Sequence, residues 1–197
     1  LTNGSAATDL QGAIRPQPNL IIAELTGGDL GKNSTGNVKT NLTGADLTGA
    51  ILKNAQMDDV ILTGANLTGA DLTGATITGI VIDGDTTNFT SAILVGASFA
   101  ASDDLTNVDM EKADLRGATL TATDLEGATL TGANLGKNGS TATNLTGATL
   151  TNAKLIKADL TEANLTNVNL TGTDLTGADL TGATLSNNTF SATTNLT

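Results

Sequence analysis

The sequence predicts a solenoid, a fold in which the chain winds into coils that stack along one axis. Leucine recurs at every fifth position in segments such as LTGTDLTGADLTGATL, residues 170–185. That spacing fits neither the period of about 3.6 residues of an α-helix nor the alternation of a half-buried strand. Aromatic residues make up only 2% of the 197 residues, against 39% hydrophobic residues, so the core is narrow and aliphatic. A fixed period over most of a chain indicates stacked repeats.

The repeating unit has five positions with distinct preferences. An apolar centre follows a small residue by two positions and directly follows Asp, Asn or Thr, and it usually precedes Thr and then Gly. The centres run by fives over residues 42–82, 89–99 and 105–190, where Ser140 takes the place of one apolar centre. We expect alanine to let the backbone approach the axis and leucine to fill the axis.

The unit A-(D/N/T)-L-T-G resembles that of the pentapeptide repeat family, and the resemblance covers about residues 42–190. It implies an all-β fold, a right-handed quadrilateral parallel β-helix with four pentapeptides per coil and about eight to nine coils. In this fold the centre and the small residue point inward, and the other three positions point outward. Glycine at the last position relieves steric conflict at each corner, and coils stack at about 4.8 Å.

Three parts of the chain are distinguished. Residues 1–41 are less regular and carry both prolines, and they are expected to form an N-terminal cap with some degenerate coils, because a solenoid end exposes unpaired strand edges. Residues 42–190 form the β-helix, and residues 191–197 form a C-terminal tail with no obvious cap. The C-terminal end is therefore either a frayed edge or a docking surface for another subunit.

Extra residues interrupt the five-residue period at 83–88 and 100–104. In the first interruption Asp83, Asp85 and Asn88 offer oxygen ligands that suit calcium, but the EF-hand pattern is not met, and a bulged corner of solvated turn residues is the simpler interpretation. The similar segments 30–45 and 135–148 are expected to lose an apolar centre on the same face. Both contain Gly-Lys-Asn without the spacing of a phosphate-binding loop.

Counting four units per coil predicts one mixed basic and apolar face and three acidic or polar faces. Exposed apolar residues rimmed by charge are typical of interfaces. The predicted interaction face consists of Ile51, Lys53, Ile93, Val95, Arg116, Lys137, Lys154, Ile156 and Lys157. The alternative is that these basic residues only offset stacked carboxylates on the same face.

Composition excludes several function classes. The chain has no His and no Cys, which leaves no Ser-His-Asp triad, no thiol nucleophile and no ordinary zinc site. We therefore expect no enzyme and no cofactor. A net charge of −11 disfavours direct nucleic-acid binding, and no run of about 18 apolar residues predicts a membrane span.

Three functions remain open. The first is a structural protein that self-associates into a homo-oligomer or polymer by end-to-end or lateral contacts, in an extracellular or cell-surface setting. The second is a regulatory module that binds a protein partner, since some proteins of the family it resembles bind DNA gyrase or topoisomerase by mimicking a DNA duplex. The third is ice binding by a Thr-x-Thr column through Thr129/Thr131, Thr149/Thr151 and Thr189/Ser191, although threonine pairs also stabilise ordinary sheets.

Overall fold

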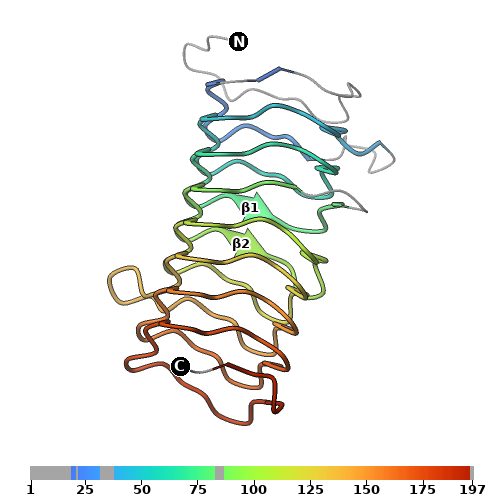
Figure 1. The fold of residues 1–197 in the computed structure, drawn as a ribbon. Helices are drawn as coiled ribbons and strands as arrows, with labels where there is room; N and C mark the ends of the chain where they lie inside the picture. The colour runs from blue at the N-terminus through green and yellow to red at the C-terminus, as the bar shows by residue number, and fades with distance from the viewer. Residues whose placement is uncertain (1–18, 21, 32–37, 83–86, 196–197) are drawn as a thin grey trace.

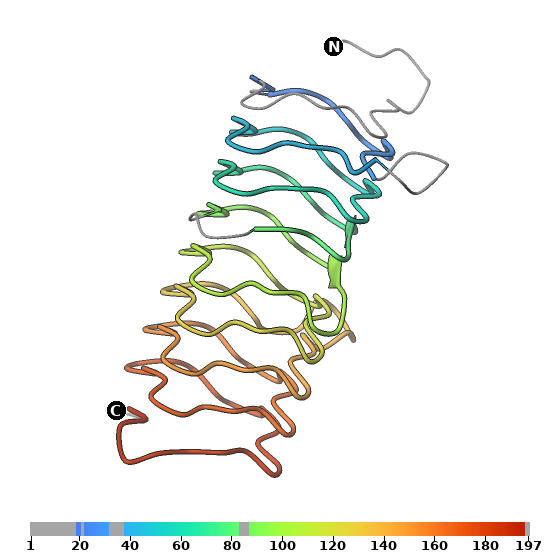
Figure 2. The same cartoon turned by 90° about the vertical axis from the view of Figure 1, so that its right-hand side faces the viewer.

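The computed structural model shows a rod of stacked coils, wound in a right-handed sense (Figures 1 and 2). It describes residues 19–20, 22–31, 38–82 and 87–195. Within these ranges there is no helix, and hence none that could cross a membrane. The fold is the predicted quadrilateral parallel β-helix.

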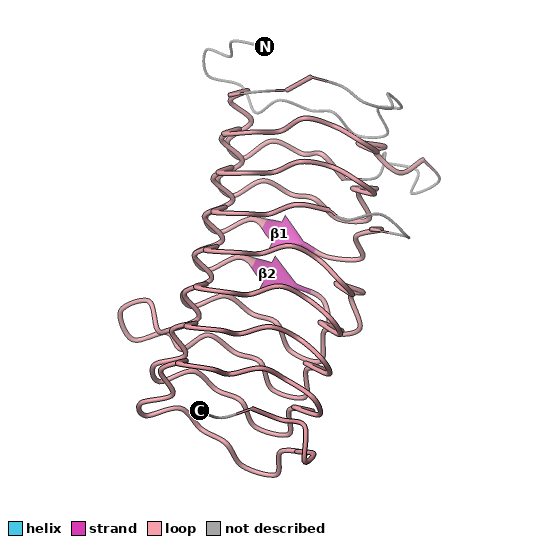
Figure 3. Ribbon diagram, in the orientation of Figure 1, coloured by secondary structure: helices cyan, strands magenta, loops and turns pink. Residues whose placement is uncertain are grey.

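Parallel backbone pairing between successive coils holds the rod together. Two short strands, β1 (Thr76–Ile77) and β2 (Ser98–Phe99), pair in parallel with Thr76 opposite Ser98 (Figure 3). Elsewhere single parallel bridges join the residue before each centre to its counterpart one coil further on. These bridges define the four faces of the rod.

Each face is named by its column of bridged residues, in the order in which the chain first reaches it. The first face contains Asn19, Asp46, Asn66, Asn88, Asp109, Thr129, Lys154, Asp174 and Asn195. The second face contains Glu24, Ile51, Asp71, Ile93, Asp114, Asn134, Asp159 and Asp179. The third face contains Asp29, Gln56, Thr76, Ser98, Thr119, Asn144, Asn164 and Thr184. The fourth face contains Asn41, Ile61 and Val81, followed by Asp104, Asp124, Thr149, Asn169 and Thr189.

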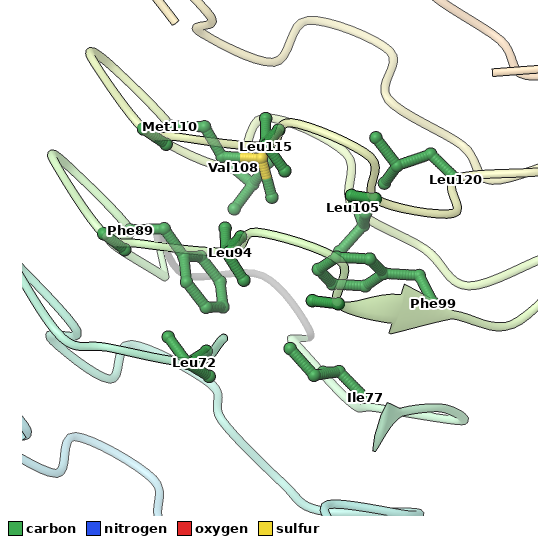
Figure 4. Packing of buried hydrophobic residues seen from close by; sticks show 14 of the residues in the cluster. Leu72, Ile77, Phe89, Leu94, Phe99, Leu105, Val108, Met110, Leu115 and Leu120 are labelled. Carbon is green, nitrogen blue, oxygen red and sulfur yellow. The ribbon is translucent and has the colours of Figure 1, made fainter. Parts of the chain in front are cut away.

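The core is a column of aliphatic side chains along the axis. Centres such as Leu47, Leu120 and Leu145 are fully buried, and so are alanines at the small position. Figure 4 shows Phe89, Leu94 and Phe99 lying between the coil of Leu72 and the coil of Leu115. Burying one such leucine contributes roughly 1.5–3 kcal/mol. The predicted inward orientation of the centre and the small residue is thus confirmed.

A tight turn at each corner explains the last two positions of the unit. The N–H of Ala45 donates to the carbonyl of Leu42 at 2.9 Å, and Gly44 between them has φ 61°. A positive φ at the third turn residue is the signature of a type II turn, which favours glycine. This positive φ explains the glycine that the sequence places at the last position of the unit.

The Asp or Asn before each centre fixes the same turn from the other side. The Asp46 carboxylate accepts the N–H of Thr48 at 3.1 Å and its hydroxyl at 2.6 Å. Asn66 and Thr68 repeat the arrangement one coil on. Side-chain hydrogen bonds of this kind, called Asx turns, favour a turn of the backbone. The recurrent (D/N)-L-T sequence therefore stabilises the corner.

One unit of the sequence does not enter the coil. Asn134 pairs with Asp159, twenty-five residues on instead of the usual twenty. Residues 136–142 leave the rod as a loop, visible at the left of Figure 1, in which Asn138 and Thr141 exchange two backbone hydrogen bonds of 2.8 and 3.0 Å. Ser140 is exposed, so its prediction as a centre was wrong. A unit without an apolar centre has nothing to bury, and it leaves without loss to the core.

A buried threonine closes the neck of this loop. The Thr143 hydroxyl donates to the carbonyl of Gly136 at 2.6 Å and accepts the N–H of Gly117 at 2.9 Å. The Thr40 hydroxyl likewise donates to Gly31 at 2.6 Å across residues 32–37, which lie outside the described ranges. Segment 30–45 passes from the third face to the fourth, whereas segment 135–148 passes from the second face to the third. The expectation that both fall on the same face was wrong.

Candidate interaction surfaces

Five residues of the predicted interaction face lie together on the second face. Ile51 and Ile93 flank Asp71 in the bridged column, and Ile93 is 38% exposed. The outward residues that follow the centres of this face include Lys53, Val95 and Arg116. Lys137 lies in the excluded loop at the edge of the face, where its ammonium contacts the Glu162 carboxylate at 2.7 Å.

The structure places the remaining three residues elsewhere. Lys154 pairs with Thr129 and Asp174, so Lys154, Ile156 and Lys157 belong to the first face and the corner after it. The reason is the excluded unit, which counting by fives assigns to the coil. The predicted face of nine residues is therefore two separate groups.

Two basic residues of the second face pair with carboxylates of the same face. Lys53 pairs with Asp71 at 3.1 Å, and the Arg116 guanidinium donates twice to Asp114, at 2.8 and 2.6 Å. Burial opposes ionisation of Asp114, but the hydrogen bonds from Arg116 outweigh it and lower the pKa of Asp114. This pairing favours the interpretation that basic residues offset stacked carboxylates. Among the described residues, no carboxylate pairs with Lys154 or Lys157.

Of the calcium candidates, Asp83 and Asp85 lie outside the described residues. Asn88 lies on the first face, and its side-chain oxygen accepts the N–H of Thr90 at 2.7 Å. Across the ranges that the structure describes, no group of three or more acidic residues is placed to hold a metal ion.

Sequence reasoning missed a buried carboxylate at the second interruption. Asp103 takes the inward small position and is only 5% exposed. It accepts the N–H of Gly79 at 2.8 Å and that of Ala100 at 2.6 Å. Burial raises the pKa of Asp103 against the effect of these two bonds, and the charge of Asp59 raises it further. The sequence does contain a signal for this site. The step from Phe99 to Leu105 is six residues instead of five, so backbone N–H groups near the extra residue need a buried acceptor.

Two centres in the last described coil are exposed. Leu175 is 3% exposed, whereas Leu185 and Phe190, both centres, are 41% and 48% exposed. The chain continues its coil past Phe190, since Asn195 pairs with Asp174, so residues 191–195 are not a separate tail. Among the described residues after Phe190, Asn195 alone forms a backbone bridge to the preceding coil, on the first face.

The outward positions near this end carry no charge on two adjacent faces. On the third face they are Asn144, Thr146, Asn164, Thr166, Thr184 and Ser186, and on the fourth face Thr149, Thr151, Asn169, Thr171, Thr189 and Ser191. The predicted Thr-x-Thr column is shorter than expected, because Thr129 lies on the first face above Lys154. Leu185 and Phe190 are the last centres of these same two faces.

Comparison with known proteins agrees with this architecture. Eight copies of the pentapeptide repeat model match residues 40–79, 104–136 and 143–182. HetL, a pentapeptide repeat protein involved in heterocyst differentiation regulation from the cyanobacterium Nostoc sp. strain PCC 7120, is 30% identical. The match covers 93% of this chain and 87% of HetL, with a TM-score of 0.54.

QnrB1, a plasmid-mediated fluoroquinolone resistance protein, is 18% identical over 95% of this chain and 86% of its own, with a TM-score of 0.45. None of the curated proteins matches the sequence significantly. The second match ends at residue 136 and the third begins at residue 143, on either side of the loop that leaves the rod. From the repeat, the coil and these matches together, the chain belongs to the pentapeptide repeat family.

Proposed function

We propose that this protein is a non-enzymatic interaction module whose rod self-associates through its C-terminal end, as a filament or cell-surface subunit. The observation that carries the proposal is the exposure of Leu185 and Phe190, two core residues, at 41% and 48%. HetL takes part in regulation. A more general form of the proposal is therefore that the same end binds a protein partner.

The physics of the end favours association. Covering apolar surface contributes roughly 25 cal/mol per Å², and open strand edges are templates for further pairing. The net charge of −11 opposes the approach of two copies. That repulsion is screened beyond about 8 Å at physiological salt, and the end itself lies next to the charge-free portions of the third and fourth faces.

Sedimentation velocity at rising protein concentration tests the proposal. We expect the wild-type protein to form species larger than a monomer, and the double variant Leu185→Ser/Phe190→Ser to remain monomeric. Ile93→Ser is the matched control, because Ile93 is similarly exposed at 38% but lies on the second face in the middle of the rod. A wild-type protein that stays monomeric at every concentration, or association lost equally in the control, contradicts the proposal.

Duplex mimicry receives less support from the arrangement of charge. The carboxylates of the fourth face gather at Asp104, Asp124 and Glu126, in the middle of the rod, and the same face is uncharged from Thr149 onward. A duplex carries a negative charge at every step, so a mimic needs an unbroken acidic stripe. A gyrase supercoiling assay tests this alternative, for which inhibition at low protein concentration is the supporting result.

A second candidate function is ice binding by the charge-free Thr and Asn surface of the third and fourth faces. It is supported by the regular rung spacing of about 4.8 Å and by side chains held in place, such as Thr171, whose hydroxyl donates to Asn169 at 2.7 Å. Thermal hysteresis measures it directly. We expect Thr151→Lys to abolish hysteresis and Thr131→Lys, on the first face, to leave it unchanged, and absence of hysteresis in the wild-type protein rejects the candidate.

A further inference from the structure

We infer that Asn138 is a site of spontaneous covalent modification, at which the side-chain amide is lost through a cyclic imide. The site is the Asn138-Gly139 dipeptide, at the tip of the loop that leaves the rod (Figure 1). It does not depend on the proposed self-association, because it lies on the side of the rod and involves neither of its ends.

The tip of this loop is a tight hairpin. Asn138 and Thr141 exchange two backbone hydrogen bonds, so Gly139 and Ser140 form the turn between them. Gly139 has φ 57°, which fits a type II′ turn, whose first central residue is usually glycine. Residues 138–141 are all exposed, so water reaches both the asparagine side chain and the peptide bond that follows it.

The reaction needs a free peptide nitrogen next to an asparagine side chain. The deprotonated nitrogen of Gly139 attacks Cγ of Asn138 and forms a C–N bond, which closes a five-membered imide. The side-chain nitrogen leaves as ammonia and takes up a proton in place of the one that Gly139 gave to water. Water then adds to one of the two imide carbonyls and opens the ring to aspartate or isoaspartate. Glycine favours the attack because it has no Cβ to shield its nitrogen or restrict its backbone.

The two reacting groups are available in the described part of the chain. Neither the N–H of Gly139 nor the side-chain amide of Asn138 has a hydrogen-bond partner among the described residues. A Cβ added at Gly139 would meet nothing within 4 Å, so no neighbouring group screens this nitrogen.

Asparagines within the coil are protected by their hydrogen bonds. The side-chain oxygen of Asn144 accepts the N–H of Thr146 at 3.0 Å, and the N–H of Leu145 donates to a carbonyl of the next coil at 2.9 Å. After Asn152, the N–H of Ala153 donates across its own turn at 3.0 Å. In both cases the nitrogen that would attack is held by the coil, so the reaction requires the coil to open.

At Asn138 only the hairpin has to open. The backbone of Asn138 must rotate to bring the nitrogen of Gly139 to Cγ, and the two hydrogen bonds to Thr141 oppose this rotation. Ser140 is exposed, so the loop buries no apolar centre. Exposed segments with few buried contacts open locally at a small fraction of the global free energy of unfolding. The native protein should therefore react here while its coils stay closed.

The product changes the surface of the rod and leaves its core intact. Either product places a carboxylate where a neutral amide was, which makes the net charge one unit more negative than −11. The new charge follows Lys137, whose ammonium contacts the Glu162 carboxylate at 2.7 Å. Isoaspartate also adds one carbon to the main chain and so distorts the hairpin. Leu135 and Leu145, the centres on either side of the loop, are fully buried in the rod.

Peptide mapping tests the inference after the native protein has been incubated in mildly alkaline buffer. Trypsin then releases residues 138–154 from the unfolded chain as one fragment, because it cleaves after Lys137 and Lys154. This fragment also contains Asn144 and Asn152, which serve as internal controls. We expect a gain of one mass unit that fragmentation assigns to Asn138, with the amides of Asn144 and Asn152 retained. A time course without this gain, or with an equal gain at the controls, overturns the inference.

Gly139→Ala is the matched control variant. Its Cβ shields the nitrogen, and the position lies outside the coil, so we expect an unchanged circular dichroism spectrum and loss of the mass gain over the same time course. Modification of Gly139→Ala at the rate of the wild type would also overturn the inference. The other Asn-Gly dipeptide, residues 3–4, lies outside the described ranges and falls in a separate tryptic fragment, so it does not affect the result.

Discussion

At several corners the glycine with positive φ lies close to the side chain at the corner of the preceding coil. A Cβ added at Gly127 would lie 2.3 Å from the Asn107 side-chain oxygen, and one added at Gly172 would lie 2.4 Å from that of Asn152. Asn107 and Asn152 themselves have φ 58°. A longer side chain at one corner is thus accommodated because glycine occupies the corner that follows it.

Gly127→Ala is expected to destabilise the protein more than Gly69→Ala does. Both glycines have similar φ, 66° and 65°, so both variants place a side chain in the left-handed region at a cost of about 1–2 kcal/mol. A Cβ at Gly69 meets nothing within 4 Å, whereas one at Gly127 must displace Asn107. Urea unfolding measures the difference.

A double-mutant cycle with Asn107→Gly isolates the clash. In that background we expect Gly127→Ala to cost no more than Gly69→Ala, so the cost of the double variant is smaller than the sum of the costs of the two single variants. Equal costs for the two alanine substitutions in the wild-type background would contradict the crowding of adjacent corners.

Ala122 offers the reverse change. It is an exposed residue with φ 53°, in a conformation that glycine adopts without steric penalty. We expect Ala122→Gly to stabilise the protein by about 0.5–1 kcal/mol, after the greater chain entropy of glycine in the unfolded state is subtracted. Ala128→Gly, at a buried inward position, should destabilise it. A loss of stability in Ala122→Gly would contradict the strain.

Acid should weaken the corners that contain aspartate. The hydroxyl and N–H of Thr176 lower the pKa of Asp174. A lowered pKa stabilises the fold above the unfolded value of about 3.9, and the stabilisation is lost as the pH falls through the folded value. Asp174→Asn retains an oxygen for Thr176 and cannot titrate.

The urea midpoint of Asp174→Asn should therefore fall less steeply than that of the wild-type protein as the pH drops below about 4. The raised pKa of Asp103 acts in the opposite direction, but it is present in both proteins and does not affect their difference. Identical pH profiles would show that Asp174 gains nothing from its hydrogen bonds.

At the scale of the repeating unit, the excluded loop can be removed without shifting the rest of the coil. Deletion of residues 136–140 brings Leu135 and Leu145 to the five-residue spacing of the other centres. We expect this variant to fold and to keep at least the stability of the wild type, apart from the exposed Lys137–Glu162 pair, which is worth about 0–1 kcal/mol.

Deletion of residues 136–139 is the matched control, because it leaves the two centres six residues apart. We expect a clearly lower unfolding midpoint for this variant in thermal denaturation monitored by circular dichroism. If both deletions are equally stable, the five-residue phase does not govern this part of the rod.

The sequence predicts the inward and outward positions of a unit better than the face on which a unit lies. Leu120 and Leu145 are buried as expected, since a five-residue period fixes their phase whether or not a unit enters the coil. Counting by fives cannot detect that residues 136–140 leave the coil, because a whole unit changes no phase. Lys154 was therefore predicted on the wrong face, although the missing apolar centre at Ser140 indicated the loop.

On the scale of the whole molecule, charge opposes assembly and apolar contact favours it. With a net charge of −11, copies repel one another, and salt weakens this repulsion. We expect sedimentation to show larger species at about 0.5 M salt than at about 0.05 M salt, concentrations that lie above and below physiological ionic strength. Dissociation at the higher salt would indicate that ion pairs hold the copies together instead.

The buried core of the rod and the arrangement of its surface residues depend on different properties of the chain. Whether one polar unit is retained in the coil or expelled as a loop leaves the leucine axis intact, yet it rotates every later surface residue by a quarter of the circumference. Gain or loss of a single five-residue segment can thus redistribute the binding chemistry of half a rod without any change to its interior.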